Sequence, residues 1–323
     1  MVRRRILLTG ASAMALTALR VHAQPAFPSK ALRIVVPFAA GGVGDLTARA
    51  VATGLAERLG QPVVIDNRPG AGGVVAADAV ARAEPDGHTL FLMSNGTAVS
   101  ASLFRSLPYD TLADFAPVST LGLFDIAVLV PADSPHATLA QLLAHARARP
   151  GQLNIGSINV GSTQHLAAEL FKSSAAIDAQ VVPFNGTPAL ITALRGRQVD
   201  VGVEILGPTL PQVRAGALRV LAVTGEQRSA VLPDVPTAVE LGVQGFVATS
   251  WNALAAPART PRLVVERLQR EVVATVATPA VQQQLRALNV EPRTSTPGQA
   301  AALLKTDVER WRAVIERAGI PRQ

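Results

Sequence analysis

The chain has 323 residues, 49% of them hydrophobic and 16% charged, and its length suggests two domains of ordinary size. This composition is typical of a globular protein and excludes a disordered chain or a fibrous repeat. The lack of cysteine excludes disulfides, zinc–thiolate sites, iron–sulfur clusters and thiol nucleophiles.

The amino-terminal segment is expected to be a secretory signal peptide. Three arginines at positions 3–5 precede a mostly apolar run over 6–19, and Val21 and Ala23 stand at the positions that a signal peptidase reads. The run is shorter than the ~20 apolar residues of a membrane span, which argues against an anchor. We therefore expect cleavage after Ala23 and a periplasmic mature protein, exported by either the general or the twin-arginine route.

The positive charge of the chain concentrates in this segment. Residues 1–23 contain four arginines and no acidic residue, so they account for more than half of the formal net charge of +7. A nucleic-acid-binding protein needs a basic surface and aromatic platforms, whereas only 4% of this chain is aromatic. The composition therefore argues against nucleic acid as a partner.

Short β-branched runs alternate with helical patterns along the mature chain, which is typical of an α/β fold with mostly parallel sheets. A first series predicts strands at 32–37, 62–66 and 89–94, with helices at 44–59 and 74–82. A second series predicts strands at 154–157, 179–183, 199–203 and 218–223, with helices at 162–173 and 188–195. Helices at 261–275, 279–288 and 297–318 follow, each with a proline near its first turn.

Two apolar extended runs, at 126–130 and 246–255, separate these series and suit two crossings between two lobes. We expect residues 24–124 and 247–323 to form lobe I and residues 125–246 to form lobe II. The last three helices should then pack on lobe I.

The loop at 37–45 joins the first expected strand to the first expected helix. Helix starts carry unpaired amides and a partial positive charge, so this loop is a candidate anion site. Asp45 could cap amides or hold a bridging water, although a plain tight turn with a capping aspartate is equally compatible with these residues. The candidate binding residues of this loop are Phe38, Ala39, Ala40, Gly41, Gly42 and Asp45.

A second strand–helix loop, at 156–163, has the spacing of a P-loop. Ser162 stands where that motif needs a phosphate-binding lysine, so nucleotide hydrolysis is not expected. The hydroxyls of this loop and the first amides of the following helix could hold a carboxylate. Alternatively, the hydroxyl at 162 or 163 could only cap the helix. His165 could add a charge or a hydrogen bond, or make only a local structural contact. The candidate binding residues here are Gly156, Ser157, Gly161, Ser162, Thr163 and His165.

Two further loops follow expected strands and complete the candidate site. They contain Ser94, Asn95 and Thr97, and Asn185 and Gly186, so all four loops lie at carboxyl ends of strands, where α/β proteins bind ligands. The glycine-rich segment at 68–73 is better explained as a surface turn. No GxSxG, HExxH or EF-hand pattern occurs in the sequence, so no motif indicates catalysis or a metal.

Seven blocks follow one another in a characteristic order along the mature chain. They are 28–30 with 34–45, 66–73, 85–89, 156–166, 183–188, 216–224 with 233–242, and 251–261. In this order they resemble the extracytoplasmic solute-binding receptors of tripartite tricarboxylate transporters, the Bordetella uptake gene family. The resemblance spans essentially the whole mature chain.

The resemblance implies a two-lobed periplasmic-binding-protein fold with the ligand held between the lobes. It implies that the loops at 38–45 and 156–163 grip a ligand carboxylate through main-chain amides and ordered waters, and that the other two loops line the rest of the pocket. It also implies a small carboxylate ligand, membrane transporter subunits as partners, no metal or cofactor, and no enzymatic activity. We expect a monomer.

Glu204 falls at a position that faces the pocket in this family. A buried carboxylate there would repel a second negative group on the ligand or pair with an amine, so we do not expect a tricarboxylate as the ligand. The alternative is an exposed loop carboxylate.

Two other functions remain compatible with the sequence. An exported hydrolase could use the same cleft with His165 and either Ser157 or Ser162, and a sensory protein could pass its loaded state to a signalling partner.

Overall fold

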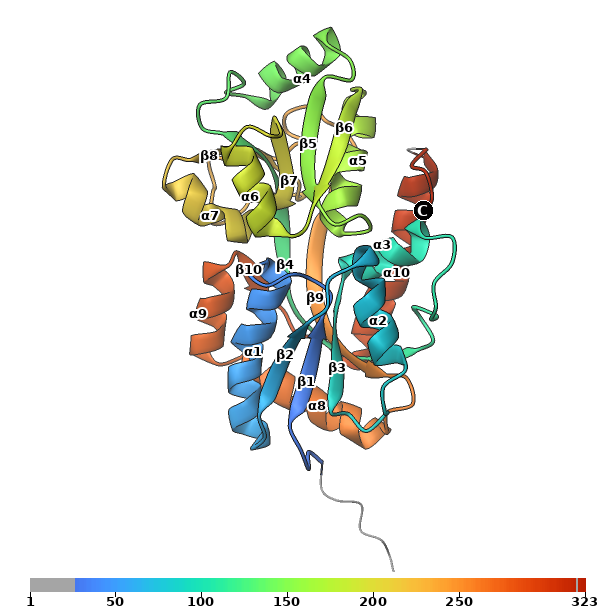
Figure 1. Ribbon diagram of the computed structural model, residues 1–323. Coiled ribbons are helices and arrows are strands. Elements are labelled where there is room, and N and C mark those ends of the chain that lie inside the picture. Colours follow the sequence, from blue (N-terminus) through green and yellow to red (C-terminus); the bar gives the residue numbers. More distant parts are fainter. Residues whose placement is uncertain (1–26, 318) are drawn as a thin grey trace, which may run out of the picture.

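The computed structural model describes residues 27–317 and 319–323, so the expected signal peptide and its cleavage site lie outside the described residues. Two α/β lobes are stacked on one another and joined by extended segments (Figure 1). This arrangement confirms the fold class expected from the sequence. Within the described part of the chain, no helix is both long and apolar enough to cross a membrane.

Lobe I, the lower body in Figure 1, contains the amino-terminal sheet. Strands β1 (Leu32–Val36), β2 (Val63–Asn67) and β3 (Thr89–Ser94) are parallel, and β9 (Thr249–Pro257), β10 (Val290–Pro292) and the first part of β4 (Phe115–Pro131) extend the sheet in antiparallel pairing. The helices of this lobe are α1 (Val43–Leu59), η1 (Ala71–Gly73), α2 (Val74–Ala81), α3 (Asn95–Leu103), α8 (Arg262–Val276), α9 (Pro279–Ala287) and α10 (Pro297–Arg317).

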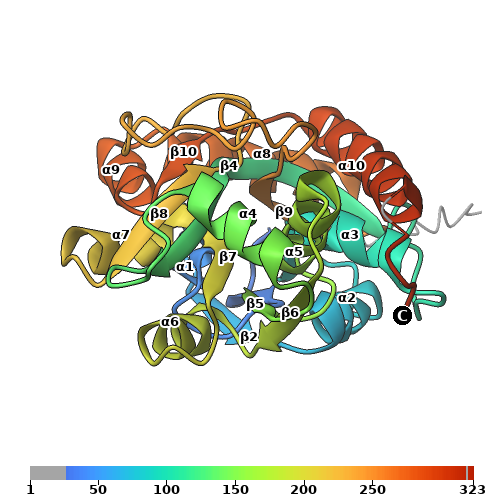
Figure 2. The same cartoon turned by 90° about the horizontal axis from the view of Figure 1, so that it is seen from above.

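The carboxyl-terminal helices pack against elements of the first sheet. Helices α8 and α9 contact α1, and α10 lies beside α3 (Figure 2). Trp311 of α10 is completely buried, and its indole nitrogen donates a hydrogen bond to Oδ1 of Asn95 at the start of α3. The end of the chain therefore supports a helix that begins at the junction of the lobes.

Lobe II contains a second sheet, in which β5 (Leu153–Ile158) pairs in parallel with β6 (Ala179–Phe184) and β7 (Val201–Ile205). The second part of β4 lies antiparallel to β7 and to β8 (Leu218–Val223). The helices of this lobe are α4 (Leu139–Ala148), α5 (Thr163–Ala175), α6 (Thr187–Arg195) and α7 (Leu206–Arg214).

Strand β4 runs through both sheets. Its partner changes from β9 to β7 between Asp125 and Ile126. The second connection returns from lobe II near Thr224, whose carbonyl accepts a hydrogen bond from the Ala248 amide just before β9. The lobe boundaries given above stay a prediction, and the change of strand partners is compatible with them.

Helix α3 differs from the sequence expectation, which treated residues 94–97 as a loop. Ser94 instead ends β3, and the helix begins at once with Asn95. Almost every residue of α3 is buried, including the small polar ones. A helix buried on all sides shows no apolar stripe in its sequence, so periodicity did not reveal it.

Candidate functional site

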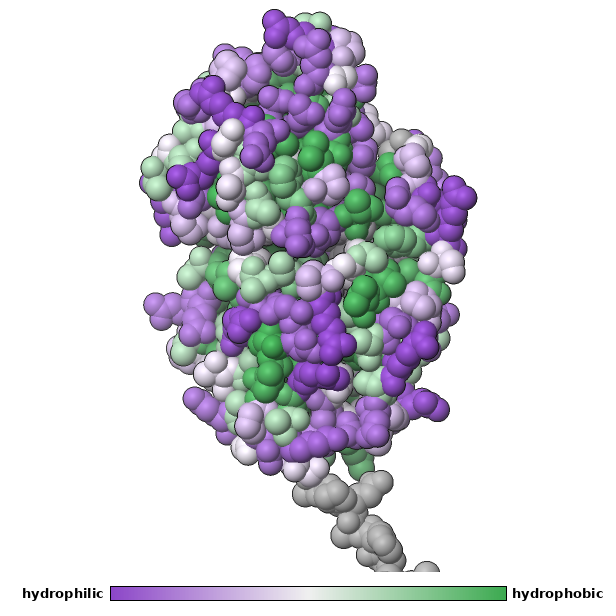
Figure 3. Space-filling view, viewed as in Figure 1, coloured by the Kyte–Doolittle hydropathy of each residue, from purple (hydrophilic) through white to green (hydrophobic). Residues whose placement is uncertain are grey.

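A small cavity, with an empty volume of about 390 Å³ that includes space open to solvent, lies where the two lobes meet. The space-filling view shows the lobes meeting across a shallow waist (Figure 3). Both lobes and both connecting strands contribute to the cavity wall. The lining residues are Phe38, Ala39, Gly42, Val43, Gly44, Ser94, Phe124, Ile158, Thr163, Gln164, Gly186, Thr187, Ile205, Ser250 and Asn252.

Five helices begin at this cavity. Helices α1, α3, α5, α6 and α7 each contribute an N-cap or first-turn residue to its wall. The N-caps of α1, α6 and α7 are Gly42, Gly186 and Ile205, and none of them caps its helix with a side chain. The first amides of these helices have no acceptor within the helix, so they are available to a ligand.

Charged side chains are missing from the cavity wall. No lysine, arginine, histidine, aspartate or glutamate occurs among the lining residues within 27–317 and 319–323. Helix starts carry a partial positive charge, so those in the cavity wall favour a bound anion.

The start of α1 is shaped by two residues of the first loop. A Cβ on Gly44 would lie only 2.7 Å from Cδ2 of Phe38, so glycine lets the phenylalanine ring pack against the first turn. Across the junction, a Cβ on Gly186 would lie 3.1 Å from the Cβ of Ala39. The loops of the two lobes thus meet at glycines, which brings their helix starts to one cavity.

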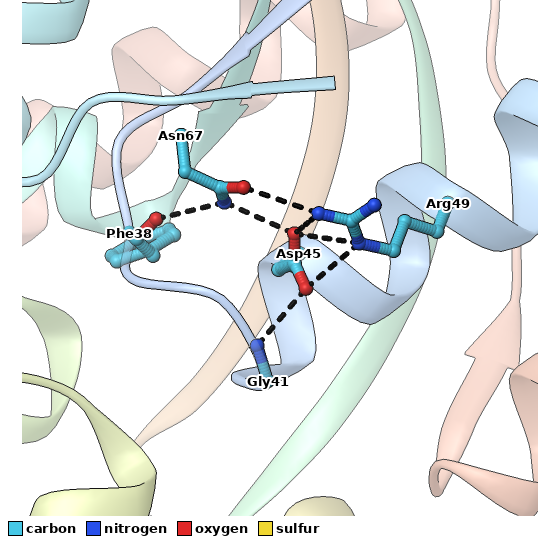
Figure 4. A network of polar contacts seen from close by, with 5 residues as sticks. All are labelled: Phe38, Gly41, Asp45, Arg49 and Asn67. Atoms are coloured by element: carbon cyan, nitrogen blue, oxygen red, sulfur yellow. Dashed lines mark hydrogen bonds and ion pairs between the residues drawn. The ribbon is translucent and has the colours of Figure 1, made fainter. Parts of the chain in front are cut away.

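Asp45 anchors this loop instead of lining the cavity (Figure 4). One carboxylate oxygen accepts the Gly41 amide at 2.9 Å, and the other accepts Arg49 and Asn67 at 3.0 Å each. Asn67 also donates to the Phe38 carbonyl at 3.0 Å. Burial alone would raise the pKa of Asp45, but these hydrogen bonds hold it below its usual value. Its role is to fix the shape of the loop.

Ser162 caps helix α5, which agrees with the structural alternative considered for it. Its hydroxyl accepts the His165 amide at 3.1 Å and donates to the Ile158 carbonyl at 2.6 Å. Thr163 lines the cavity, and its hydroxyl donates to Oδ1 of Asn95 at 3.2 Å across the lobe junction. The two neighbouring hydroxyls therefore have different roles.

Six of the residues expected from the sequence line the cavity. They are Phe38, Ala39, Gly42, Ser94, Thr163 and Gly186. The other twelve do not belong to the lining: Ala40, Gly41, Asp45, Asn95, Thr97, Gly156, Ser157, Gly161, Ser162, His165, Asn185 and Glu204. Several of these lie directly behind the wall and position it.

Asn95 and Thr97 are turned into the protein. The Asn95 amide donates to Asp307 of α10 at 2.7 Å, and its carbonyl accepts Trp311 and Thr163. The Thr97 hydroxyl accepts the Ser94 amide at 3.2 Å, which supports the start of α3.

The two glycines of the second loop serve packing. A Cβ on Gly156 would lie 2.5 Å from Cδ1 of Leu190, so this glycine lets α6 approach β5. Gly161 has a φ of +85°, and a Cβ there would lie 3.0 Å from the Cα of Gly72 in lobe I. Gly161 therefore belongs to the contact between the lobes.

His165 does not form a nucleophile–base pair with either serine of the hydrolase alternative. Only its backbone amide meets Ser162, and Nδ1 of its ring is buried without a partner within the described ranges. The Ser157 hydroxyl is likewise buried and unpaired. Burial lowers the pKa of His165 and favours the neutral ring. This geometry does not support hydrolysis.

Glu204 is completely buried in β7, so the exposed-loop alternative for it is wrong. Its Oε1 accepts the side-chain amide of Gln164 at 2.8 Å and the Ile205 backbone amide at 2.7 Å. Burial raises the pKa of Glu204 to about 7, and the hydrogen bonds oppose this shift. The carboxylate lies behind Gln164, which lines the cavity.

Nine lining residues were not expected from the sequence: Val43, Gly44, Phe124, Ile158, Gln164, Thr187, Ile205, Ser250 and Asn252. Most are neighbours of expected ones. Ser250 and Asn252 lie in an extended run where alternate residues share a face. That alternation, with polar residues on both sides of Trp251, is the signal that could have identified them.

A second groove, with an empty volume of about 1400 Å³ that includes open solvent, contains several arginines. These arginines already have partners: Arg228 pairs with Glu240 at 2.9 Å, Arg286 lies 3.7 Å from a Glu291 carboxylate oxygen, and Arg310 donates to a backbone carbonyl at 3.0 Å. Among the described residues, no group of three His, Asp or Glu side chains could hold a metal ion. The cavity at the helix starts is the stronger candidate site.

Comparison with known proteins identifies the family. The model of the tripartite tricarboxylate transporter family receptor matches residues 47–320. A protein of Pseudomonas sp. strain P51, described as the UPF0065 protein in the tcbD-tcbE intergenic region, is 37% identical over 97% of this chain and 94% of its own length. Protein BugT of Bordetella pertussis is 35% identical over 91% of this chain and 90% of its own.

Solved structures give the same result. Rpa4515 of R. palustris, solved with adipate, has a TM-score of 0.88 and 33% identity over 91% of this chain and 99% of its own. MatC of Rhodopseudomonas palustris, solved with bound malate, has a TM-score of 0.85 and 33% identity over 90% of this chain and 100% of its own. The chain thus belongs to the tripartite tricarboxylate transporter receptor family, and it is a periplasmic solute-binding protein, not an enzyme.

Proposed function

We propose that this receptor binds a small carboxylate in the cavity at the lobe junction and delivers it to the membrane subunits of a transporter. The observation that carries the proposal is the convergence of helix starts from both lobes on one cavity. Backbone amides at helix starts form strong hydrogen bonds to anions without a cationic side chain. The adipate and malate held by two similar proteins support the same ligand class.

Contacts between the lobes indicate how the ligand would be enclosed. The Ser100 hydroxyl of α3 donates to the Gly161 carbonyl at 3.3 Å, and Thr163 reaches Asn95. A ligand that touches helix starts of both lobes binds the closed form better than an open one, so it shifts the population toward closure. We place the hinge in β4 and in the segment that precedes β9, where the chain passes between lobe I (24–124 and 247–323) and lobe II (125–246).

Removing one amide tests the proposal. Val43 is the first residue of α1, a position where proline is tolerated because its amide has no intrahelical partner. Gly42 has ψ of 167°, which a following proline accepts. We expect Val43→Pro to weaken carboxylate binding about 10- to 100-fold, as loss of a charge-assisted hydrogen bond, with little change in the unfolding midpoint.

Two matched variants control for other effects of this change. Val43→Ala shortens the side chain but keeps the amide, and Arg262→Pro makes the same replacement at the start of α8. Both should bind carboxylates like the parent protein in calorimetry. Equal affinity of Val43→Pro and Val43→Ala would show that the α1 amide does not hold the ligand.

Delivery to a transporter and export are tested in cells. Cells lacking the receptor should regain uptake of the labelled carboxylate with the parent protein but not with Val43→Pro.

We also propose that the mature protein is a monomer that begins at Gln24. The mass of the protein recovered from the periplasm checks both statements, and a dimer or another amino terminus would contradict them.

A further inference from the structure

The side-chain amide of Gln164 has a defined orientation. Its nitrogen donates to Glu204 at 2.8 Å, and turning the amide over would bring two acceptor oxygens together. Gln164 lines the cavity, and with its nitrogen turned to Glu204 its carbonyl oxygen is an acceptor for a ligand, beside the second hydrogen of its amide.

Glu204 maintains this orientation whether or not it carries a proton. The oxygen that meets Gln164 also accepts the Ile205 amide at 2.7 Å, so it is an acceptor in both protonation states. The other oxygen, Oε2, is buried and has no hydrogen bond of good geometry in the described part of the chain, although the Thr187 side chain is close enough to lower the pKa of Glu204. Oε2 is therefore the oxygen that can carry the proton. Glu204 is therefore a positioning residue that acts through Gln164.

Asn252 provides the second polar group of the cavity. Its side chain is 1% exposed and lines the cavity, yet neither its amide nitrogen nor its carbonyl oxygen has a partner within residues 27–317 and 319–323. A buried amide without partners is costly to a fold. A ligand that hydrogen-bonds with Asn252 removes this cost.

The chemistry of the two amides defines the group that fits them. Gln164 offers an acceptor and the second hydrogen of its amide, and Asn252 offers an acceptor and a donor. A second carboxylate has no hydrogen to donate, and an ammonium group has no acceptor for the Asn252 nitrogen. A hydroxyl or a neutral amide both donates and accepts, so it can form hydrogen bonds with both side chains: the hydroxyl donates to one of the two carbonyl oxygens, and a primary amide can donate to both.

Given the proposed carboxylate receptor, we propose that its ligand carries a neutral hydroxyl or amide group read by Gln164 and Asn252, with Glu204 fixing Gln164. The receptor then prefers hydroxy-substituted monocarboxylates over the unsubstituted acid and over the dicarboxylate of equal length. The side-chain amides of Gln164 and Asn252 then select ligands that carry a hydrogen-bond donor, whereas the helix starts select for the carboxylate.

Matched acids test the preference by calorimetry. The four-carbon set is butanoate, its 2-, 3- and 4-hydroxy derivatives and succinate, and the six-carbon set is hexanoate, 6-hydroxyhexanoate and adipate. In at least one set, a hydroxy acid should bind about tenfold tighter than the unsubstituted acid and the dicarboxylate of the same chain length. Carboxylates that bind without this preference overturn the inference and leave the proposed function intact, whereas binding of none of them overturns both.

Variants of Glu204 assign the preference to the amide orientation. Glu204→Met removes the acceptor, so Gln164 can turn and the preference should fall to about threefold or less. Glu204→Gln keeps an oxygen that can accept both amides and should retain the preference. Glu226→Gln, an exposed carboxylate outside the cavity wall, controls for the lost charge. An unchanged preference in Glu204→Met would overturn the positioning role.

Asn252→Leu separates a ligand-binding role from a structural one. If the amide serves the ligand, replacing it with an apolar group of similar size removes an unpaired buried amide. The unliganded variant should then unfold about 3 °C higher than the parent protein and lose the preference for a hydroxyl. A lower midpoint would show that the protein itself uses the amide and would overturn its assignment to the ligand.

Discussion

At the scale of single residues, Glu204 is the strongest departure from ordinary protein chemistry in the site. A carboxyl group without a cationic partner is completely buried, and its polar neighbours are the Gln164 and Ile205 amides on one oxygen and the Thr187 side chain. Burial favours the neutral acid, which raises the pKa of Glu204 to about 7. The group should therefore make stability depend on pH.

The expected pH dependence has a definite sign. The pKa of Glu204 is raised from 4.5 in a free side chain to about 7 in the folded protein, so the folded state binds its proton more tightly. The contribution of Glu204 to stability is present below about pH 4.5 and is lost as the pH rises through about 7.

A comparison of unfolding midpoints checks this effect. Between about pH 5 and about pH 8, the parent protein should lose stability relative to Glu204→Gln, which cannot titrate at this position. The exposed variant Glu226→Gln should follow the parent curve. Parallel curves for the parent protein and Glu204→Gln would show that Glu204 titrates normally.

The residues of the site were partly predictable because strand–loop–helix junctions are visible in sequence. The glycines and hydroxyls at these junctions indicated Gly42, Thr163 and Gly186, which line the cavity. Sequence does not show which way a side chain turns. Asn95 and Ser157, at equally suitable positions, point into the protein because α10 and the sheet supply their surroundings.

At the scale of elements, the site consists of helix starts held close together by contacts between loops. Ser100 of α3 donates to carbonyls on both sides of the junction, to Gly72 at 2.8 Å and to Gly161 at 3.3 Å. A Cβ on Gly72 would lie 2.8 Å from the Val160 carbonyl oxygen. The contact between the lobes therefore leaves no room for a Cβ at position 72.

Gly72→Ala should impair closure. Because the added methyl group meets lobe II only when the lobes are closed, we expect about tenfold weaker carboxylate binding. X-ray scattering of the unliganded variant should show a larger radius of gyration than that of the parent protein.

Gly216→Ala is the matched control for backbone strain. Gly216 has a φ of +68°, close to the +63° of Gly72, but a Cβ there has nothing within 4 Å. Both variants should lose about 1 kcal/mol of stability from backbone strain, and Gly72→Ala should lose more, because its Cβ would also lie 3.0 Å from Cε2 of Phe104 in lobe I. Only Gly72→Ala should bind more weakly. Equal affinities would show that the contact between Gly72 and lobe II does not limit closure.

At the scale of the whole molecule, the two-lobed fold follows from local patterns repeated twice. Strands such as β1 and helices such as α1 were predictable because buried β-branched runs and apolar stripes are local signals. Strand β4 is longer than expected, since Pro117, Gly122 and Asp125 interrupt its apolar pattern. Helix α7 contains Pro208 and Pro211, which disfavour a helix in sequence.

The full length of β4 and helix α3 were missed for one shared reason. Strand β4 is stabilised by pairing with strands distant in the chain, and α3 by burial against α10. Such contacts form only in the complete fold, so no short segment shows them. They also form the junction of the lobes, where the ligand is expected to bind.

The most direct test of the account is a crystal structure of the receptor with a bound carboxylate. We predict the carboxylate oxygens within about 2.7–3.2 Å of backbone amides at the starts of α1 and of α5 or α6, with no cationic side chain in contact. A carboxylate held by Arg228, Arg286 or Arg310 in the second groove, with the cavity at the helix starts free of ligand, would contradict the account.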